Sequence, residues 1–212
     1  MTSIPLKPQY GPTLGKLLEP RWHSAAPTVR ALAIAAGVGL LALMIALVLS
    51  LLNASYSQGG AVPFSFEYRS LYKTPPNLGG YVKVARSSDG KLDDSYAVAP
   101  IAIAAYSGSV SGELPLAAAA YTRTLATRFP AFRQEGEGKT RISSTLAGYQ
   151  VLYSAIVNGQ RLYGRDVILI PPHHSAKEGV VVEMLSSELA SVSKPVASSG
   201  VLETPLKTFA FG

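Results

Sequence analysis

The pattern of apolar and polar positions divides the chain into two parts. Residues 31–52 are apolar almost throughout and carry no charged side chain, and Arg30 borders them. A helix rises ~1.5 Å per residue, so this segment is long enough to cross a hydrocarbon layer roughly 30 Å thick. A core helix of a soluble domain is rarely apolar on every side over such a length. The pattern therefore predicts a transmembrane helix over residues 30–52.

A cleaved export signal is the main alternative for this segment. Such signals combine a short basic start, an apolar stretch of about 7–15 residues and a small-residue cleavage site. Here the apolar stretch is longer and follows a tail, and Ser55 and Ser57 make only a poor cleavage pair. The sequence favours an uncleaved anchor and leaves a processed, secreted protein open.

The flanking charges predict an orientation. Basic residues outnumber acidic ones before the apolar segment, which is preceded by Lys7, Lys16, Glu19, Arg21 and Arg30. No residue from Asn53 to Phe66 is charged. Because basic flanks stay cytoplasmic, we expect residues 1–29 to be a flexible cytoplasmic tail and the C-terminal part to be extracytoplasmic. The composition, rich in Ala, Leu and Gly, fits a bacterial plasma membrane protein.

Small residues recur on one face of the predicted transmembrane helix. They follow steps of three and four positions: Ala35, Gly39, Ala42, Ala46 and Ser50. Small side chains allow a second helix to approach closely, so this face could pack against a partner helix. Ala and Gly are also common in membrane helices at large, which leaves an unpartnered helix open.

The remaining chain reads as a linker and one domain. Residues 53–63 are polar and rich in Gly and Ser, which indicates a linker. Residues 64–212 form the predicted domain. Apolar and polar residues alternate in 64–69 and 81–86, the pattern of strands buried on one face. Residues 96–108 read as a strand that is apolar on both faces.

A helix and a hairpin follow in the predicted domain. The segment "GELPLAAAAYTRTLATRF", 112–129, predicts an amphipathic helix that Pro130 ends. Its apolar stripe consists of Ala118, Tyr121, Leu125 and Phe129. Asn158-Gly159 joins two strand-like runs, 148–157 and 160–170, and suits a type I′ turn.

A further strand, "GVVVEMLSS", precedes a short helical stretch and a closing "TFAF". Neighbouring strands joined by tight turns predict an antiparallel sheet, and helices covering it make an α+β domain.

Three segments together carry a resemblance to a known fold. These are "FSFEYR" at the start, "LAGYQVLYSAIVNGQRLYGRDVILIPP" with Leu146, Ala147 and Gly148, and "VLETPLKTFAF" at the end. In this order of elements, residues 64–212 resemble the PsbP-like fold. That superfamily includes the photosystem II extrinsic protein and the LpqN-type lipoproteins of actinobacteria.

The resemblance implies an antiparallel sheet covered by helices on both faces, an α/β/α sandwich. It also implies a binding or accessory protein and not an enzyme. The chain departs from the lipoproteins because a membrane helix stands where they carry a lipidated cysteine.

Charge and composition exclude some classes of function. The net charge is +6, but no block of basic residues forms a phosphate footprint, so we expect no nucleic-acid partner. The chain has no cysteine, which rules out a disulfide framework and a cysteine nucleophile. Phosphate-binding glycine loops and the Gly-x-Ser-x-Gly motif are also missing from the sequence. We expect no cofactor.

Two candidate functional sites remain, each with a weak sequence signal. His173, His174 and Glu178 in "PPHHSAKE" could hold zinc in a metal-dependent hydrolase, although adjacent histidines in an extended segment point apart. A solvated loop is the simpler interpretation.

The second candidate is a ligand groove formed by Tyr149, Tyr153, Tyr163, Arg161 and Arg165. Tyrosine suits half-buried binding clefts, and the two arginines share a strand face, with Tyr163 expected opposite, where they could hold an anion. More often, tyrosines in such a pattern are strand residues whose hydroxyls reach the rim of the sheet, and the two arginines can be a solvated edge. The function predicted overall is a non-catalytic scaffold or adaptor for a protein partner in the membrane or envelope.

Overall fold

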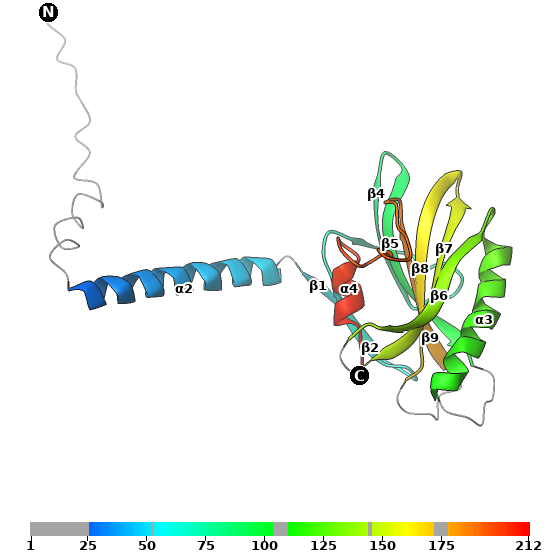
Figure 1. Ribbon diagram of the computed structural model, residues 1–212, viewed down its shortest axis with the longest axis horizontal. Coiled ribbons are helices and arrows are strands. Elements are labelled where there is room, and N and C mark those ends of the chain that lie inside the picture. The colour runs from blue at the N-terminus through cyan, green and yellow to red at the C-terminus, as the bar shows by residue number, and fades with distance from the viewer. Residues whose placement is uncertain (1–25, 52, 104–109, 144–145, 172–177) are drawn as a thin grey trace, which may run out of the picture. The chain divides into compact units, whose positions relative to one another are not determined.

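The computed structural model describes residues 26–51, 53–103, 110–143, 146–171 and 178–212 (Figure 1). Their contacts separate two units, Met1–Leu52 and Asn53–Gly212.

The first unit contains helix α2, Pro27–Leu51. Its apolar segment Pro27–Val48 is long enough to cross a membrane, and none of it is buried against other parts of the described chain. Both a membrane anchor and an export signal fit such a helix. The predicted packing face stays a prediction, because Ala35, Gly39, Ala42 and Ala46 are as exposed as the other faces.

The second unit is built on a seven-stranded antiparallel sheet (Figure 1). Its strands are, in spatial order, β3 (Tyr72–Thr74), β4 (Val82–Ser88), β5 (Lys91–Ala102), β9 (Glu178–Ser186), β8 (Gln160–Leu169), β7 (Ala147–Val157) and β6 (Arg133–Arg141). The α+β class with antiparallel sheets predicted from the sequence is therefore what the structure shows.

Two tight hairpins set the register of this sheet. Asn158 and Gly159 have φ of 50° and 78°, and Val157 pairs with Gln160, which confirms the predicted β7–β8 turn. Beyond Arg86, β4 and β5 continue to a turn at Asp89-Gly90, where φ is 51° and 75°. Asp-Gly tolerates the same positive φ as Asn-Gly, which explains the second hairpin.

Helix α3, Val110–Arg128, packs on one face of the sheet. The predicted stripe is confirmed: Ala118, Leu125 and Phe129 are buried and Tyr121 packs beside them. Their apolar partners come mainly from β7, β8 and β9, and include Val151, Ile168 and Val181.

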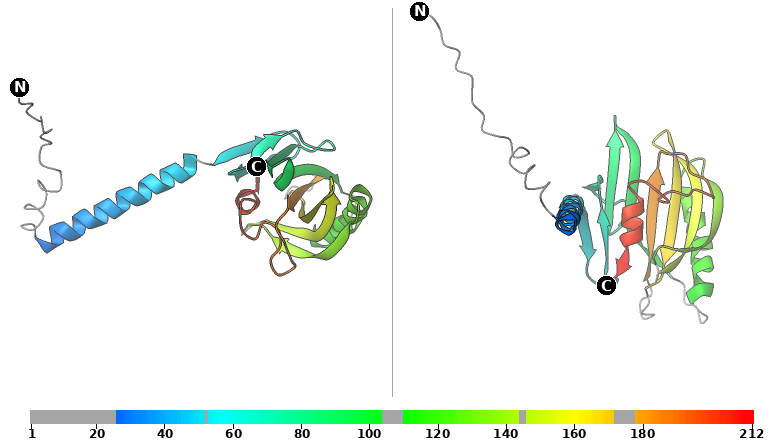
Figure 2. Two further views of the ribbon diagram at one scale, coloured as in Figure 1. Left: turned by 90° about the horizontal axis from the view of Figure 1, so that it is seen from above. Right: turned by 60° about the vertical axis from the view of Figure 1, so that its left-hand side comes forward.

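The opposite face is covered differently from the prediction. Helix α4, Glu203–Thr208, is short, and most of the cover is a second sheet of β1 (Ala54–Gln58), β2 (Phe64–Tyr68) and β10 (Ala210–Phe211). Figure 2 shows this cyan sheet and the red helix α4 away from the green helix α3. The prediction that helices cover both faces was thus only partly right. The alternating aromatic residues of β2 bury a strand on the face where a helix was expected.

Two further segments are strands that the apolar pattern did not predict. Residues 53–63 were expected to be a linker, but β1 pairs with β2, and Tyr56 packs against Phe64 and Phe66. Residues 133–141 form the edge strand β6, whose polar sequence hid it from an apolar pattern. Charged residues on an edge strand oppose pairing with other chains, which accounts for that composition.

Candidate functional site

Helix α3 covers only part of its face of the sheet. It contacts β7 and β8, and the corresponding face of β4 and β5 has no helix over it among the described residues. Here lies a cavity of about 430 Å³, which we call the β5 groove. Its floor includes Ala97 and Ala99 of β5, and its rim includes Asn77, Gly80 and the Asn158-Gly159 turn.

The groove follows from side-chain size on β5. Tyr96 and Val98 point to the opposite face, where both are fully buried. Ser95, Ala97 and Ala99 alternate with them and face the groove. Such small side chains leave space above the strand, because each adds at most one heavy atom beyond Cβ. Phe129 and Leu185 add apolar walls.

Three charged side chains meet in the groove. Arg128 donates to both carboxylate oxygens of Glu183, from Nη1 to Oε1 at 2.7 Å and from Nη2 to Oε2 at 3.1 Å. Burial alone would lower the pKa of Arg128, but the hydrogen bond and charge of Glu183 outweigh burial and raise it. Lys83 is half-buried nearby. Burial, and then the charge of Arg128, lower the pKa of the Lys83 ammonium.

Glu183 also connects the groove to a buried polar network under α3. The Tyr121 hydroxyl lies 2.7 Å from Glu183 Oε1 and 3.0 Å from Asp166 Oδ2. The Tyr153 hydroxyl lies 3.2 Å from both Asp166 oxygens. Asp166 is fully buried, and burial, then the charge of Glu183, raise the pKa of its carboxyl well above the ordinary value.

A count of protons explains how this network is satisfied. Tyr121 has one hydroxyl proton and contacts two carboxyl groups, so it can donate to only one of them. If Asp166 is protonated, it donates to the Tyr121 oxygen, Tyr121 donates to Glu183, and Tyr153 donates to the other Asp166 oxygen. Each of these three hydrogen bonds then has one proton. The raised pKa of Asp166 and the geometry therefore point to the same neutral carboxyl.

Gly164 makes room for this network. It lies opposite Tyr153 in the β7–β8 pairing, and the Tyr153 ring passes directly over it. Any Cβ at position 164 would overlap the ring. The missing side chain thus lets Tyr153 lie across β8 and reach Asp166.

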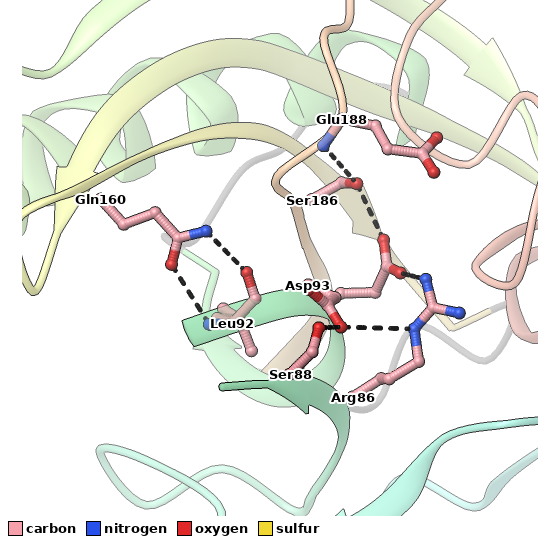
Figure 3. A network of polar contacts seen from close by, with 8 residues as sticks. Arg86, Ser88, Leu92, Asp93, Gln160, Ser186 and Glu188 are labelled. Atoms are coloured by element: carbon pink, nitrogen blue, oxygen red, sulfur yellow. Dashed lines mark hydrogen bonds and ion pairs between the residues drawn. The ribbon is translucent and has the colours of Figure 1, made fainter. Parts of the chain in front are cut away.

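A second polar network closes the sheet where β9 ends (Figure 3). The Gln160 side chain donates to Leu92 O at 2.9 Å and accepts from Leu92 N at 3.2 Å, bridging β8 and β5 beyond the last residue of β9. Arg86 donates to Asp94 at 2.6 Å, and Ser186 donates to the other Asp94 oxygen at 2.8 Å. These contacts fix the groove end at Leu92 and Gln160.

The structure does not bring the five predicted groove residues together. Tyr149 and Tyr153 face α3, whereas Tyr163 packs on the opposite face. Arg161 is exposed. Tyr163 shares the strand parity of Arg161 and Arg165, so the expectation that it lies opposite them was wrong.

Arg165 has a structural role in the fold. It is 7% exposed and donates to Val196 O at 3.2 Å and Thr140 Oγ1 at 3.1 Å. Burial lowers the pKa of its guanidinium. These bonds hold the segment after β9 against the sheet.

The metal hypothesis falls outside the described residues. His173 and His174 are not described, and Glu178 is exposed at the start of β9. Within the described part of the chain, no group of three or more His, Asp or Glu residues is arranged to hold a metal ion.

Comparison with known proteins gives structural likenesses only. No protein-family profile and no curated protein matches the sequence. The chain is similar to LpqN of Mycobacterium tuberculosis, a protein involved in cell envelope biogenesis, with 9% identity, 75% of this chain and 91% of that chain covered, and a TM-score of 0.47. It is also similar to the Ran-binding protein Mog1p of Saccharomyces cerevisiae, with 10% identity, coverage of 74% and 94%, and a TM-score of 0.46.

A third similar structure is a protein of unknown function, PA94 of Pseudomonas aeruginosa, with 13% identity, coverage of 67% and 85%, and a TM-score of 0.34. The LpqN-type proteins to which the sequence was likened are thus among the similar structures. At these scores the likenesses carry no argument about activity or partners.

Proposed function

We propose that this chain is a non-catalytic binding protein, held in the plasma membrane by α2, with its second unit displayed outside the cytoplasm. The observation that carries the proposal is the β5 groove, an open cavity of about 430 Å³ over strands whose opposite face is closed. The groove combines apolar walls with polar and charged side chains, and cavities of this size are typical of ligand sites.

The charged groups of the groove support binding over catalysis. Glu183 is held by Arg128 and Tyr121, and Asp166 lies beneath the surface with no exposed atoms. A general base has to reach its substrate within hydrogen-bond distance. Neither carboxyl group is free to do so in this arrangement, whereas both fit a role in holding Arg128 and the groove wall in place.

The anchor gives the proposal its location. Helix α2 is apolar and exposed along its described side chains, and the basic residues precede it. The helix ends at Leu51 and β1 begins at Ala54. A domain tied by so short a segment would act close to the membrane, on a partner or ligand of the envelope.

Site-specific crosslinking in intact membranes tests this function. A photoreactive benzoylphenylalanine replaces Ala99 in the groove of the full-length chain, and a control replaces Lys139, which is exposed on the edge strand β6. We expect a discrete adduct from position 99 that is lost when Ala97→Trp fills the groove, and none from position 139. The proposal fails if position 99 gives no adduct, or if Ala97→Trp leaves the adduct unchanged.

A further inference from the structure

Lys83 is the unsatisfied charge of the β5 groove. It stands on β4 and is half-buried, yet no described carboxylate lies within ion-pair distance of its ammonium group. The charge of Glu183 partly offsets the burial of this ammonium, but Glu183 makes its ion pair with Arg128. A partly desolvated cation without a direct ion pair costs free energy that an exposed lysine does not. Its neighbour Arg128 brings further positive charge to the same place.

The one acidic group in the groove is already engaged. Glu183 accepts from Arg128 at both oxygens and from the Tyr121 hydroxyl. The lining residues otherwise include two lysines, Lys83 and Lys91, and no second carboxylate. The groove therefore has an excess of positive charge that an incoming anion would neutralise. Neither lysine is in a described ion pair, and Lys83 is the half-buried one of the two.

Apolar surface lies beside Lys83 in the groove, next to polar lining residues such as Ser95, Asn158 and Gln160. Ala97 and Ala99 form a flat floor beside Lys83, and Leu185, Phe129 and Val157 stand around it. A volume of about 430 Å³ falls within the range of roughly 300–1,000 Å³ found for small-molecule sites. A fully hydrated inorganic anion would leave these apolar walls without contacts.

We propose that the groove binds a small organic anion, whose apolar body rests on Ala97 and Ala99 and whose carboxylate pairs with Lys83. This inference rests on the proposed binding function and names its ligand class. The ammonium of Lys83 donates to the carboxylate, and the Arg128–Glu183 pair stays intact beside it. Apolar contact supplies affinity, and the single charge contact selects anions over neutral analogues.

The test is a titration of the full-length chain in phosphatidylcholine nanodiscs, followed by NMR at the amides of Ala97 and Ala99. Hexanoate is the probe, and hexanol and hexylammonium are its neutral and cationic counterparts. We expect saturable shifts with hexanoate and at least roughly tenfold weaker binding of hexanol, because a hydrogen bond to a charged group is lost.

Matched variants assign the effect to Lys83. Lys83→Gln should weaken hexanoate binding roughly tenfold and leave hexanol unaffected, and Lys83→Arg should restore the preference for the anion. Lys139→Gln makes the same charge change on β6, outside the groove, and should have no effect. Equal binding of hexanoate and hexanol, no saturable binding, or unchanged affinity in Lys83→Gln overturns the inference. If the crosslink from position 99 persists in those cases, the binding function stands and only the ligand class is wrong.

Discussion

The two faces of the seven-stranded sheet are built for different purposes. On one face Phe64, Phe66 and Phe209 close over β4, β5 and β9 in a buried apolar cluster, and buried polar side chains such as Arg165 and Asp94 lie beside it. On the other face α3 covers β7 and β8, places a carboxyl network under itself, and leaves the β5 groove open. We infer that the closed face supplies most of the stability, so that the other face can keep an open groove. Substitutions should therefore have unequal effects on the two faces.

The largest effect is expected on the closed face from Phe66→Ala. Phe66 is 2% exposed and contacts the rings of Tyr56, Phe64, Tyr68 and Tyr96. Removing a buried phenyl ring should lower the free energy of unfolding by about 3–5 kcal/mol. Urea unfolding of the full-length chain in detergent, followed by near-UV circular dichroism, measures this. Leu185→Ala, on the groove wall, is the matched control, and an equal loss there would remove the distinction between the faces.

A moderate effect is expected from Gly164→Ala under α3. The added methyl group would overlap the Tyr153 ring and push its hydroxyl away from Asp166. Overpacking of this kind costs about 1–3 kcal/mol. The same unfolding experiment measures it, with Gly138→Ala in the exposed strand β6, where a Cβ has open space, as the control. Equal stability of Gly164→Ala and wild type would show that Tyr153 does not depend on this gap.

A smaller effect, which depends on pH, is expected from Asp166→Asn. The pKa of Asp166 is raised in the folded protein, so its carboxyl favours the folded state fully below the unfolded pKa of about 3.8. That contribution declines as pH rises towards the folded pKa. Asparagine keeps the shape of the protonated acid without titrating. We therefore measure the free energy of unfolding of wild type and of Asp166→Asn over a pH series. The stability of the variant relative to wild type should rise with pH, and a difference that is constant with pH would contradict a neutral Asp166.

The smallest effect is expected from Arg161→Gln. Arg161 is exposed and lies apart from the β5 groove. Surface substitutions away from special features change stability by less than about 0.5 kcal/mol. Binding of hexanoate should also be unchanged. A marked loss of stability or of hexanoate binding would show that Arg161 contributes to the candidate site after all.

Local patterns predicted the elements that local forces determine. Asn158-Gly159 predicted its hairpin because only that turn type needs two positive φ angles, and the α3 stripe predicted its buried face from the helical period. The strand order could not be read in the same way. β5 pairs with β9, although Asp94 and Ser186 are far apart in sequence, and no local signal records such a pairing.

The candidate site was harder to predict because its floor consists of small residues. Ala97 and Ala99 have no chemical signature, and the groove forms because their side chains are small and α3 lies mainly over β7 and β8. Two signals were nevertheless present in β8. Asp166 is a charged residue type at a buried strand position and so requires partners, and Gly164, two residues before it on the same strand face, indicates a close approach. The tyrosines chosen instead fell on different faces because strand parity alone does not tell which residues α3 covers.

Cysteine labelling tests most directly the central claim, that an open groove is displayed outside the membrane. The chain has no cysteine, so each introduced thiol is unique. Spheroplasts expressing Ala99→Cys, Ala118→Cys or Lys7→Cys are treated with a membrane-impermeant maleimide. We expect rapid labelling at position 99, none at position 118, which lies on the buried face of α3, and labelling at position 7 only after lysis. Labelling at position 7 in intact spheroplasts, or protection at position 99 equal to that at position 118, would contradict the central claim.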